Sequence, residues 1–233
     1  MRENYLTGIK QKYIMEETTT TTTEKHSPLL TIPAKVISYV FHPLFIPTYV
    51  FLFLIYQVPY EFAGITEYQL QLRLFSIFWL TAFFPAFAVF LLWRLKFSDS
   101  IFLRTQKERI VPYIITMFFY WWMYFLSRNF TDQPAVLKFF YMGIFMATVA
   151  GLILNNYFKI SLHGMAVGGA LAAIILFAMY YRLPLGLYMS VAALLTGIVC
   201  TSRFLVSDHT NAEVYAGLAV GISCQLVAYY FLM

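Results

Sequence analysis

The sequence predicts an all-α protein, a polytopic transmembrane helical bundle of about six to seven spans. The first observation is composition: 61% of the residues are apolar and only 12% are charged, whereas a soluble domain has roughly 25% charged residues. Secondly, apolar residues gather into runs close to the ~20 residues that a helix needs to cross a bilayer. Thirdly, these runs are continuous, whereas the strands of a membrane barrel alternate apolar and polar residues.

Seven apolar runs are candidate spans, with boundaries good to a few residues. They are residues 36–56, 74–93, 110–127, 137–158, 163–181, 184–201 and 214–233. His42, Pro43 and Pro47 lie in the first run. We expect them to kink the start of that helix and to have no catalytic role.

Residues 1–33 are polar and include the threonine run Thr18–Thr23, so we expect a disordered tail. No apolar stretch follows its early basic residues, so we do not expect a signal peptide. Residues 34–233 are expected to form one integral membrane domain. Cys200 and Cys224 both fall in apolar runs and have no metal-ligand spacing.

The connections between the runs alternate in character. The segments 94–109, 159–162 and 202–213 follow the second, fourth and sixth runs, so seven spans place all three on one face of the membrane. Charged residues at a membrane boundary are costly and usually functional. The candidate site residues in or beside these segments are Arg104, Lys107, Arg109, Lys159, Ser161, His163, Arg203, His209 and Glu213.

This set of side chains is suited to the chemistry of an oxyanion. Arginine matches phosphate oxygens with a planar fork, and histidine can attack phosphorus or protonate a leaving oxygen. His209 and Glu213 share one face if their segment is helical, which leaves one ring nitrogen of His209 free. Asp99, Glu108, Asp208 and Glu213 are scattered, so we expect a metal-free covalent reaction without a cofactor.

Two pairs of small residues follow the polar segments. Gly164-xxx-Gly168 begins the fifth run, and Gly217-xxx-Gly221 lies in the seventh. Glycines at this spacing let helix backbones approach closely. We therefore expect the fifth and seventh helices to pack tightly and to bring the two candidate histidines together.

The spacings within the polar segments carry a family resemblance. Ser202-Arg203 is followed after five residues by His209 and after three more by Glu213. This resembles the third motif of the type 2 phosphatidic acid phosphatase superfamily, Ser-Arg-x5-His-x3-Asp, with Glu in place of Asp. That superfamily also includes vanadium haloperoxidases, which are soluble.

The other two motifs of the family are matched in part. Ile160-Ser161-Leu162-His163 keeps the Ser-x-His of the second motif, Pro-Ser-Gly-His. For the first motif, Lys-x6-Arg-Pro, Arg109 is the counterpart of the arginine, while Pro112 comes three residues later and position 102 is Phe. The resemblance covers about residues 94–217.

The resemblance implies a role for each candidate. His209 would attack phosphorus and form a phosphohistidine, Glu213 would orient His209, and His163 would protonate the leaving group. Phosphate oxygens would be bound by Arg109, Arg203 and Ser161, with Arg104, Lys107 and Lys159 as candidates for the work of the motif lysine.

The resemblance thus implies a bundle with a family-like core, and a phosphatase for a phosphomonoester or diphosphate of a lipid. Its partners would be a lipid phosphate and membrane lipids, with no nucleic acid. Membrane members of the family work at the extracytoplasmic face of the cell membrane, and the resemblance implies the same orientation for this site. Lys and Arg outside the polar segments are evenly divided between the two sides, so charge favours neither orientation.

Two other interpretations fit the same residues. Buried His, Arg and Glu side chains can form a permeation or coupling site in a transporter or ion-binding protein. A catalytically inactive, lipid-binding relative would also keep the fold and part of the motifs.

Overall fold

A computed structural model describes residues 27–103, 105–130, 132–206 and 209–233, and these residues form helices and no strand. Within them, six helical segments are long and apolar enough to cross a membrane. This confirms the predicted all-α polytopic bundle. The predicted disordered tail lies outside the described residues up to residue 26.

The six spans follow the last six predicted runs, with ends that differ by up to seven residues. The first consists of α4 (Glu67–Phe78), a π-helical turn (Trp79–Phe83) and α5 (Phe84–Arg94). The others are α6 (Gln106–Asn129), α7 (Ala135–Leu154), α8 (Leu162–Tyr181), α9 (Gly186–Val206) and α10 (Asn211–Leu232).

The first predicted run, 36–56, is not one helix, which corrects the prediction of a kinked span. It is divided between α2 (Pro28–Val40) and α3 (Ile46–Gln57), with a break at 41–45. Pro43 contributes to the break because proline has no N–H to donate and restricts the residue before it. The helix also starts before the predicted tail ends, since residues 28–33 are the first turns of α2.

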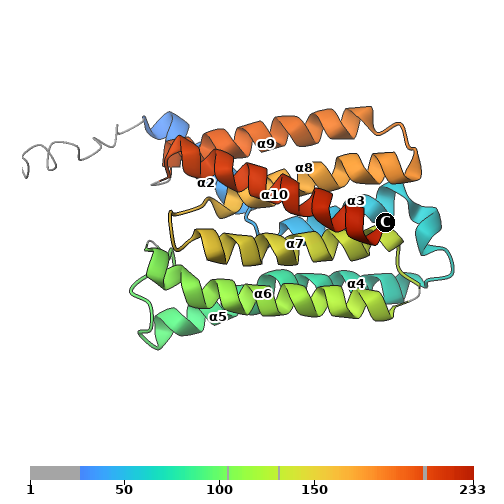
Figure 1. The fold of residues 1–233 in the computed structure, drawn as a ribbon, viewed down its shortest axis with the longest axis horizontal. Helices are drawn as coiled ribbons and strands as arrows, with labels where there is room; N and C mark the ends of the chain where they lie inside the picture. The colour runs from blue at the N-terminus through green and yellow to red at the C-terminus, as the bar shows by residue number, and fades with distance from the viewer. Residues whose placement is uncertain (1–26, 104, 131, 207–208) are drawn as a thin grey trace, which may run out of the picture.

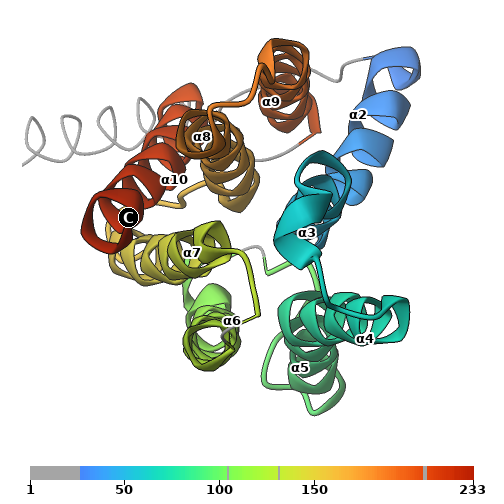
Figure 2. The ribbon, with the colours of Figure 1, turned by 90° about the vertical axis from the view of Figure 1, so that its right-hand side faces the viewer.

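The long helices run side by side, and α7 lies between α6 and α10 (Figure 1). In the end-on view α2 is seen from the side, so it crosses the direction of the long helices (Figure 2). The start of α2 lies at one end of the bundle and the C-terminus at the other (Figure 1). An odd number of passes along the bundle requires this arrangement, and the broken run of α2 and α3 makes the first pass without a helix long enough to count among the six candidate spans.

Three helices begin at the end of the bundle where α2 lies, and side chains cap each of them. Thr105 and Thr210 form capping boxes with Glu108 and Glu213, and Ser161 caps α8. Each cap satisfies backbone N–H groups that have no partner inside the helix. The positive ends of three helix dipoles therefore face the same end of the bundle.

Helices α8 and α10 touch backbone to backbone through their glycines. A Cβ added at Gly164 would lie 2.6 Å from the carbonyl oxygen of Val214, and one at Gly168 would lie 2.5 Å from that of Leu218. Added Cβ atoms at Gly217 and Gly221 would collide with the carbonyl oxygens of Ser161 and Met165. The predicted close packing is confirmed.

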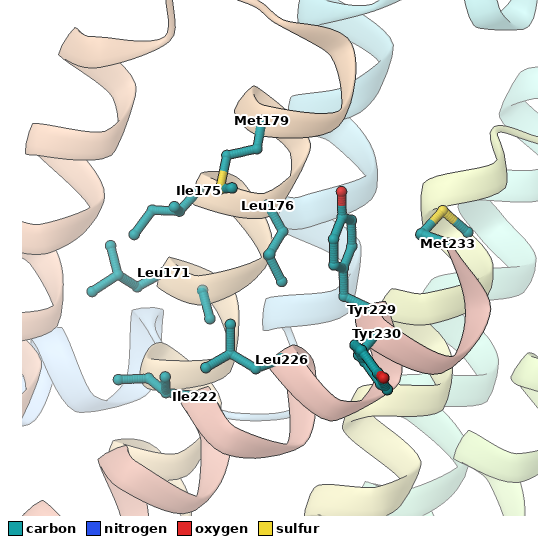
Figure 3. Close-up of a pocket in the computed structure, with 10 residues that line it drawn as sticks. Leu171, Ile175, Leu176, Met179, Ile222, Leu226, Tyr229, Tyr230 and Met233 are labelled. Carbon is teal, nitrogen blue, oxygen red and sulfur yellow. The ribbon is translucent and has the colours of Figure 1, made fainter.

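The two helices separate toward their C-terminal ends. An apolar groove of about 580 Å³ lies between them there, lined by side chains that include Leu171, Ile175 and Leu226 (Figure 3). This groove is at the opposite end of the bundle from the polar segments. The helices therefore touch beside the candidate residues and diverge away from them.

Gly168→Ala should destabilise the protein because the new Cβ meets a backbone carbonyl that cannot move aside. Overpacking of this kind costs about 1–3 kcal/mol. Thermal unfolding in detergent should show a lower Tm than the wild type. Gly197→Ala is the matched control, since a Cβ at this helical glycine meets nothing within 4 Å; an equal loss in both variants would contradict the account of the α8–α10 contact.

Candidate active site

Hydrogen bonds between distant parts of the chain join the three predicted polar segments at one end of the bundle. Arg109 Nη1 donates to the carbonyl of Ile160 (3.2 Å), and the backbone N–H of Ser161 donates to the carbonyl of Glu213 (3.2 Å). Asn155 Nδ2 also reaches the carbonyl of Gln106 (2.9 Å). The three segments therefore lie together at one end of the bundle, as the alternation of the runs predicted.

His209 and Glu213 form the predicted pair, but a capping box produces it. The helix α10 begins only at Asn211, so His209 lies outside it. Glu213 Oε2 accepts from the backbone N–H of Thr210 (2.9 Å) and lies 3.2 Å from His209 Nδ1. A carboxylate oxygen only accepts, so the shared hydrogen belongs to Nδ1 and the lone pair to Nε2.

The other oxygen of this carboxylate fixes a second segment. Glu213 Oε1 accepts from the backbone N–H of Lys159 at 3.2 Å. With the bond from Ser161 to the Glu213 carbonyl, this attaches the 159–161 connection to the first turn of α10. One residue thus caps a helix, holds a loop and orients a histidine.

His209 is surrounded by positive charge. Its side chain is 4% exposed. Burial lowers the pKa of His209 from 6.5 to about 4, and the charges of Arg109, Arg203 and Lys159 act in the same direction, against the hydrogen bond to Glu213. Predicted cations from three separate segments therefore lie within electrostatic reach of the predicted nucleophile.

Arg109 and Ser161 also have structural contacts. Arg109 is buried, and its Nε donates to the carbonyl of Leu103 (3.0 Å) in addition to the bond to Ile160. Ser161 is fully buried, and its Oγ accepts from the N–H of Gly164 at 3.3 Å. Both residues lie at the site, where they hold the backbone that surrounds His209.

His163 contacts a part of the chain that the sequence motifs do not cover. Its Nε2 lies 3.0 Å from the carbonyl oxygen of Ser38, and its ring meets that of His42 edge to face, with centroids 5.4 Å apart. Arg203 Nη1 donates to Ser38 Oγ at 3.4 Å. The break between α2 and α3 is therefore part of the site.

Sequence reasoning assigned His42 only to a kink and did not select Ser38 or Asn155. The signal for His42 was present, because a histidine inside an apolar run is a polar group at membrane depth. Ser38 is recognised only from the fold, because its contacts with His163 and Arg203 join distant parts of the chain. Asn155 is buried at the end of α7, and its Oδ1 has no hydrogen-bond partner within the described residues.

Two predicted residues are not placed at the site. Lys107 is exposed on the first turn of α6 and makes no side-chain hydrogen bond within the described residues. Arg104 lies outside the described residues. The remaining candidates, Arg109, Lys159, Ser161, His163, Arg203, His209 and Glu213, lie at the same end of the bundle.

This arrangement combines an oriented histidine with cations and helix N-termini. A neutral imidazole with a free Nε2 lone pair can act as a nucleophile or a base. Guanidinium groups and the N-terminal ends of helices attract an anion to the same place. The site is therefore chemically suited to holding an oxyanion beside a nitrogen nucleophile.

Comparison with known proteins finds no family model that matches this chain, and no match among curated proteins or solved structures. The geometry of the site and the motif spacings are therefore what indicate a function for this chain.

The folded protein should lose stability as the pH falls from about 6.5 to about 4. Burial lowers the pKa of His42 to about 4, as it does that of His209. The unfolded chain then binds protons that the folded chain excludes, so the stability present above pH 6.5 is lost on acidification. Tm measured in detergent across this range should show the fall.

His209→Asn is the variant that isolates one of the two groups, because the amide can still donate to Glu213 but does not titrate. Its Tm should depend less steeply on pH than that of the wild type. An identical dependence would show that His209 does not contribute.

Proposed function

We propose that this protein is a membrane phosphatase that hydrolyses a phosphomonoester or diphosphate of a lipid through a phosphohistidine. The observation that carries the proposal is the His209–Glu213 pair, with Nδ1 and Oε2 3.2 Å apart, surrounded by Arg109, Arg203 and Lys159. The matched Ser-Arg-x5-His-x3-Glu spacing supports the same assignment.

The first step is attack of His209 Nε2 on phosphorus. As the N–P bond forms, the bond to the leaving oxygen breaks and positive charge develops on the imidazole. The Glu213 carboxylate stabilises that charge through Nδ1–H, as the carboxylate of a catalytic triad does. In the second step water attacks phosphorus, the N–P bond breaks, and His209 is restored.

The negative charge of the phosphoryl group is balanced by the chain itself. Arg203 and Lys159 lie within electrostatic reach of His209, and Arg109 adds its charge from the start of α6. The N-terminal ends of α8 and α10 contribute partial positive charge. In this mechanism no metal is needed, and activity should persist in EDTA.

The position of the site in the bundle supports a lipid as the proposed substrate. The polar segments lie where the apolar helices α6, α8 and α10 begin. A headgroup at the membrane surface would reach this end while its acyl chains stay in the bilayer. In line with the resembled family, we propose that this end faces the extracytoplasmic side of the cell membrane.

His209→Ala should abolish phosphate release from lipid phosphates, with folding retained. Glu213→Gln should reduce the rate by several powers of ten, since an amide cannot stabilise the imidazolium. Glutamine is a normal partner in a capping box, so α10 should still be capped. The measurement is phosphate release from detergent-solubilised protein over a panel of lipid phosphates, with Tm as the folding control.

Glu67→Gln is the matched control for Glu213→Gln. Glu67 is an exposed residue in the first turn of α4, which begins at the opposite end of the bundle (Figure 1). The turnover of the Glu67→Gln variant should equal that of the wild type. Turnover near the wild-type rate in His209→Ala would show that His209 is not the nucleophile.

The orientation is tested with a single cysteine at Thr21, in a variant with Cys200 and Cys224 replaced by Ala. The start of α2 lies at the site end of the bundle (Figure 1). An impermeant maleimide should therefore label the cysteine in intact cells. Labelling only after lysis would place the site on the cytoplasmic side.

A further inference from the structure

The break between α2 and α3 releases a backbone carbonyl that contacts His163. In a continuous helix the carbonyl of Ser38 would accept from the N–H of His42, four residues later. Here the N–H of His42 donates to Tyr39 instead (3.3 Å). The Ser38 carbonyl therefore remains available and lies 3.0 Å from His163 Nε2.

This contact decides where the hydrogen of His163 lies. A carbonyl oxygen only accepts, so Nε2 of His163 carries the hydrogen, and Nδ1 is the nitrogen left to exchange a proton. The ring of His42 meets that of His163 at an interplanar angle of 84°, a favourable edge-to-face arrangement that limits rotation. His42 is itself held, because its Nδ1 accepts from the N–H of Leu44 at 3.4 Å.

A third contact joins the same backbone to the cationic part of the site. Ser38 is 7% exposed, and its Oγ accepts from Arg203 Nη1. One residue of α2 thus contacts His163 through its carbonyl and Arg203 through its side chain. The end of α2 therefore contacts both His163 and Arg203, which come from two different helices.

We propose that Ser38 and His42 are positioning residues that hold His163 in the Nε2–H tautomer, so that Nδ1 is the atom that protonates the leaving group. This inference rests on the proposed phosphatase function and adds a fourth chain segment to its site. Neither residue touches the substrate, since both act through the ring of His163.

The proton balance of the reaction follows from this assignment. As His209 Nε2 bonds to phosphorus and the P–O bond breaks, Nδ1–H of protonated His163 passes its proton to the leaving oxygen. Nε2–H stays bonded to the Ser38 carbonyl throughout. When water attacks the phosphohistidine, its proton goes to Nδ1, and His163 returns to its starting state.

The tautomer is tested without any turnover by nitrogen NMR of the full chain, labelled with ¹⁵N-histidine and reconstituted in nanodiscs. His163→Gln identifies the His163 resonances by their loss. We expect a protonated Nε2 and an unprotonated Nδ1 for neutral His163, and exchange between tautomers in His42→Ala. A hydrogen on Nδ1 in the wild type would overturn the proposal.

The second arm measures phosphate release from aryl phosphates with good and poor leaving groups. General acids matter most where the leaving oxygen is basic. His42→Ala should slow the poor substrates by roughly tenfold or more and the good ones much less. The double variant His42→Ala/His163→Ala should be no slower than His163→Ala, because His42 acts only through His163.

His42→Phe is the matched control, since it keeps an aromatic ring at this place and should restore part of the lost rate. Equal slowing of all substrates, or independent effects of the two histidines in the double variant, would overturn the positioning role. Absence of turnover in the wild type would refute the proposed phosphatase. In that case the NMR result alone decides whether Ser38 and His42 hold His163.

Discussion

The backbone contact between α8 and α10 is the constraint on which the site depends. At Gly164 and Gly217 the helices approach so closely that an added methyl group would meet a carbonyl of the partner helix. Beside this contact the N–H of Ser161 donates to the carbonyl of Glu213 at 3.2 Å. Small residues at the interface of two membrane helices let their backbones approach closely enough for such contacts. The glycines therefore bring the second and third motif segments together.

The carboxylate of Glu213 joins the segments at this contact because it has several hydrogen-bond partners. It caps α10, accepts from the N–H of Lys159 and orients His209. The interactions that stabilise the helix start are thus the ones that place His209, the proposed nucleophile. Such pre-organisation means that little rearrangement is needed when charge develops in a reaction. Burial and, to a lesser degree, the surrounding cations keep the pKa of His209 low, so its Nε2 lone pair stays available at neutral pH.

The break between α2 and α3 shows how an irregular backbone contributes to the site. A straight helix over 36–56 would satisfy its own carbonyls and leave none for a histidine. The break at 41–45 lets the Ser38 carbonyl meet His163 and brings the His42 ring against it. Non-helical backbone at membrane depth is tolerated where it is buried in protein. The break fits this rule, because the carbonyl of Ser38 accepts a hydrogen bond from His163.

The sequence by itself determined the helical membrane class, six of the seven runs as helices, the close glycine packing and the side on which the polar segments meet. The length of each apolar run and the order of the runs decide these features, and both can be read directly from the sequence. The tertiary structure alone decided that His209 lies before α10, that Arg109 and Ser161 hold backbone groups, and that Ser38 and His42 reach His163. These features depend on which carbonyls and N–H groups lack a helical partner and on what distant residue lies opposite them. No spacing along the chain records that, because it follows from how the helices pack.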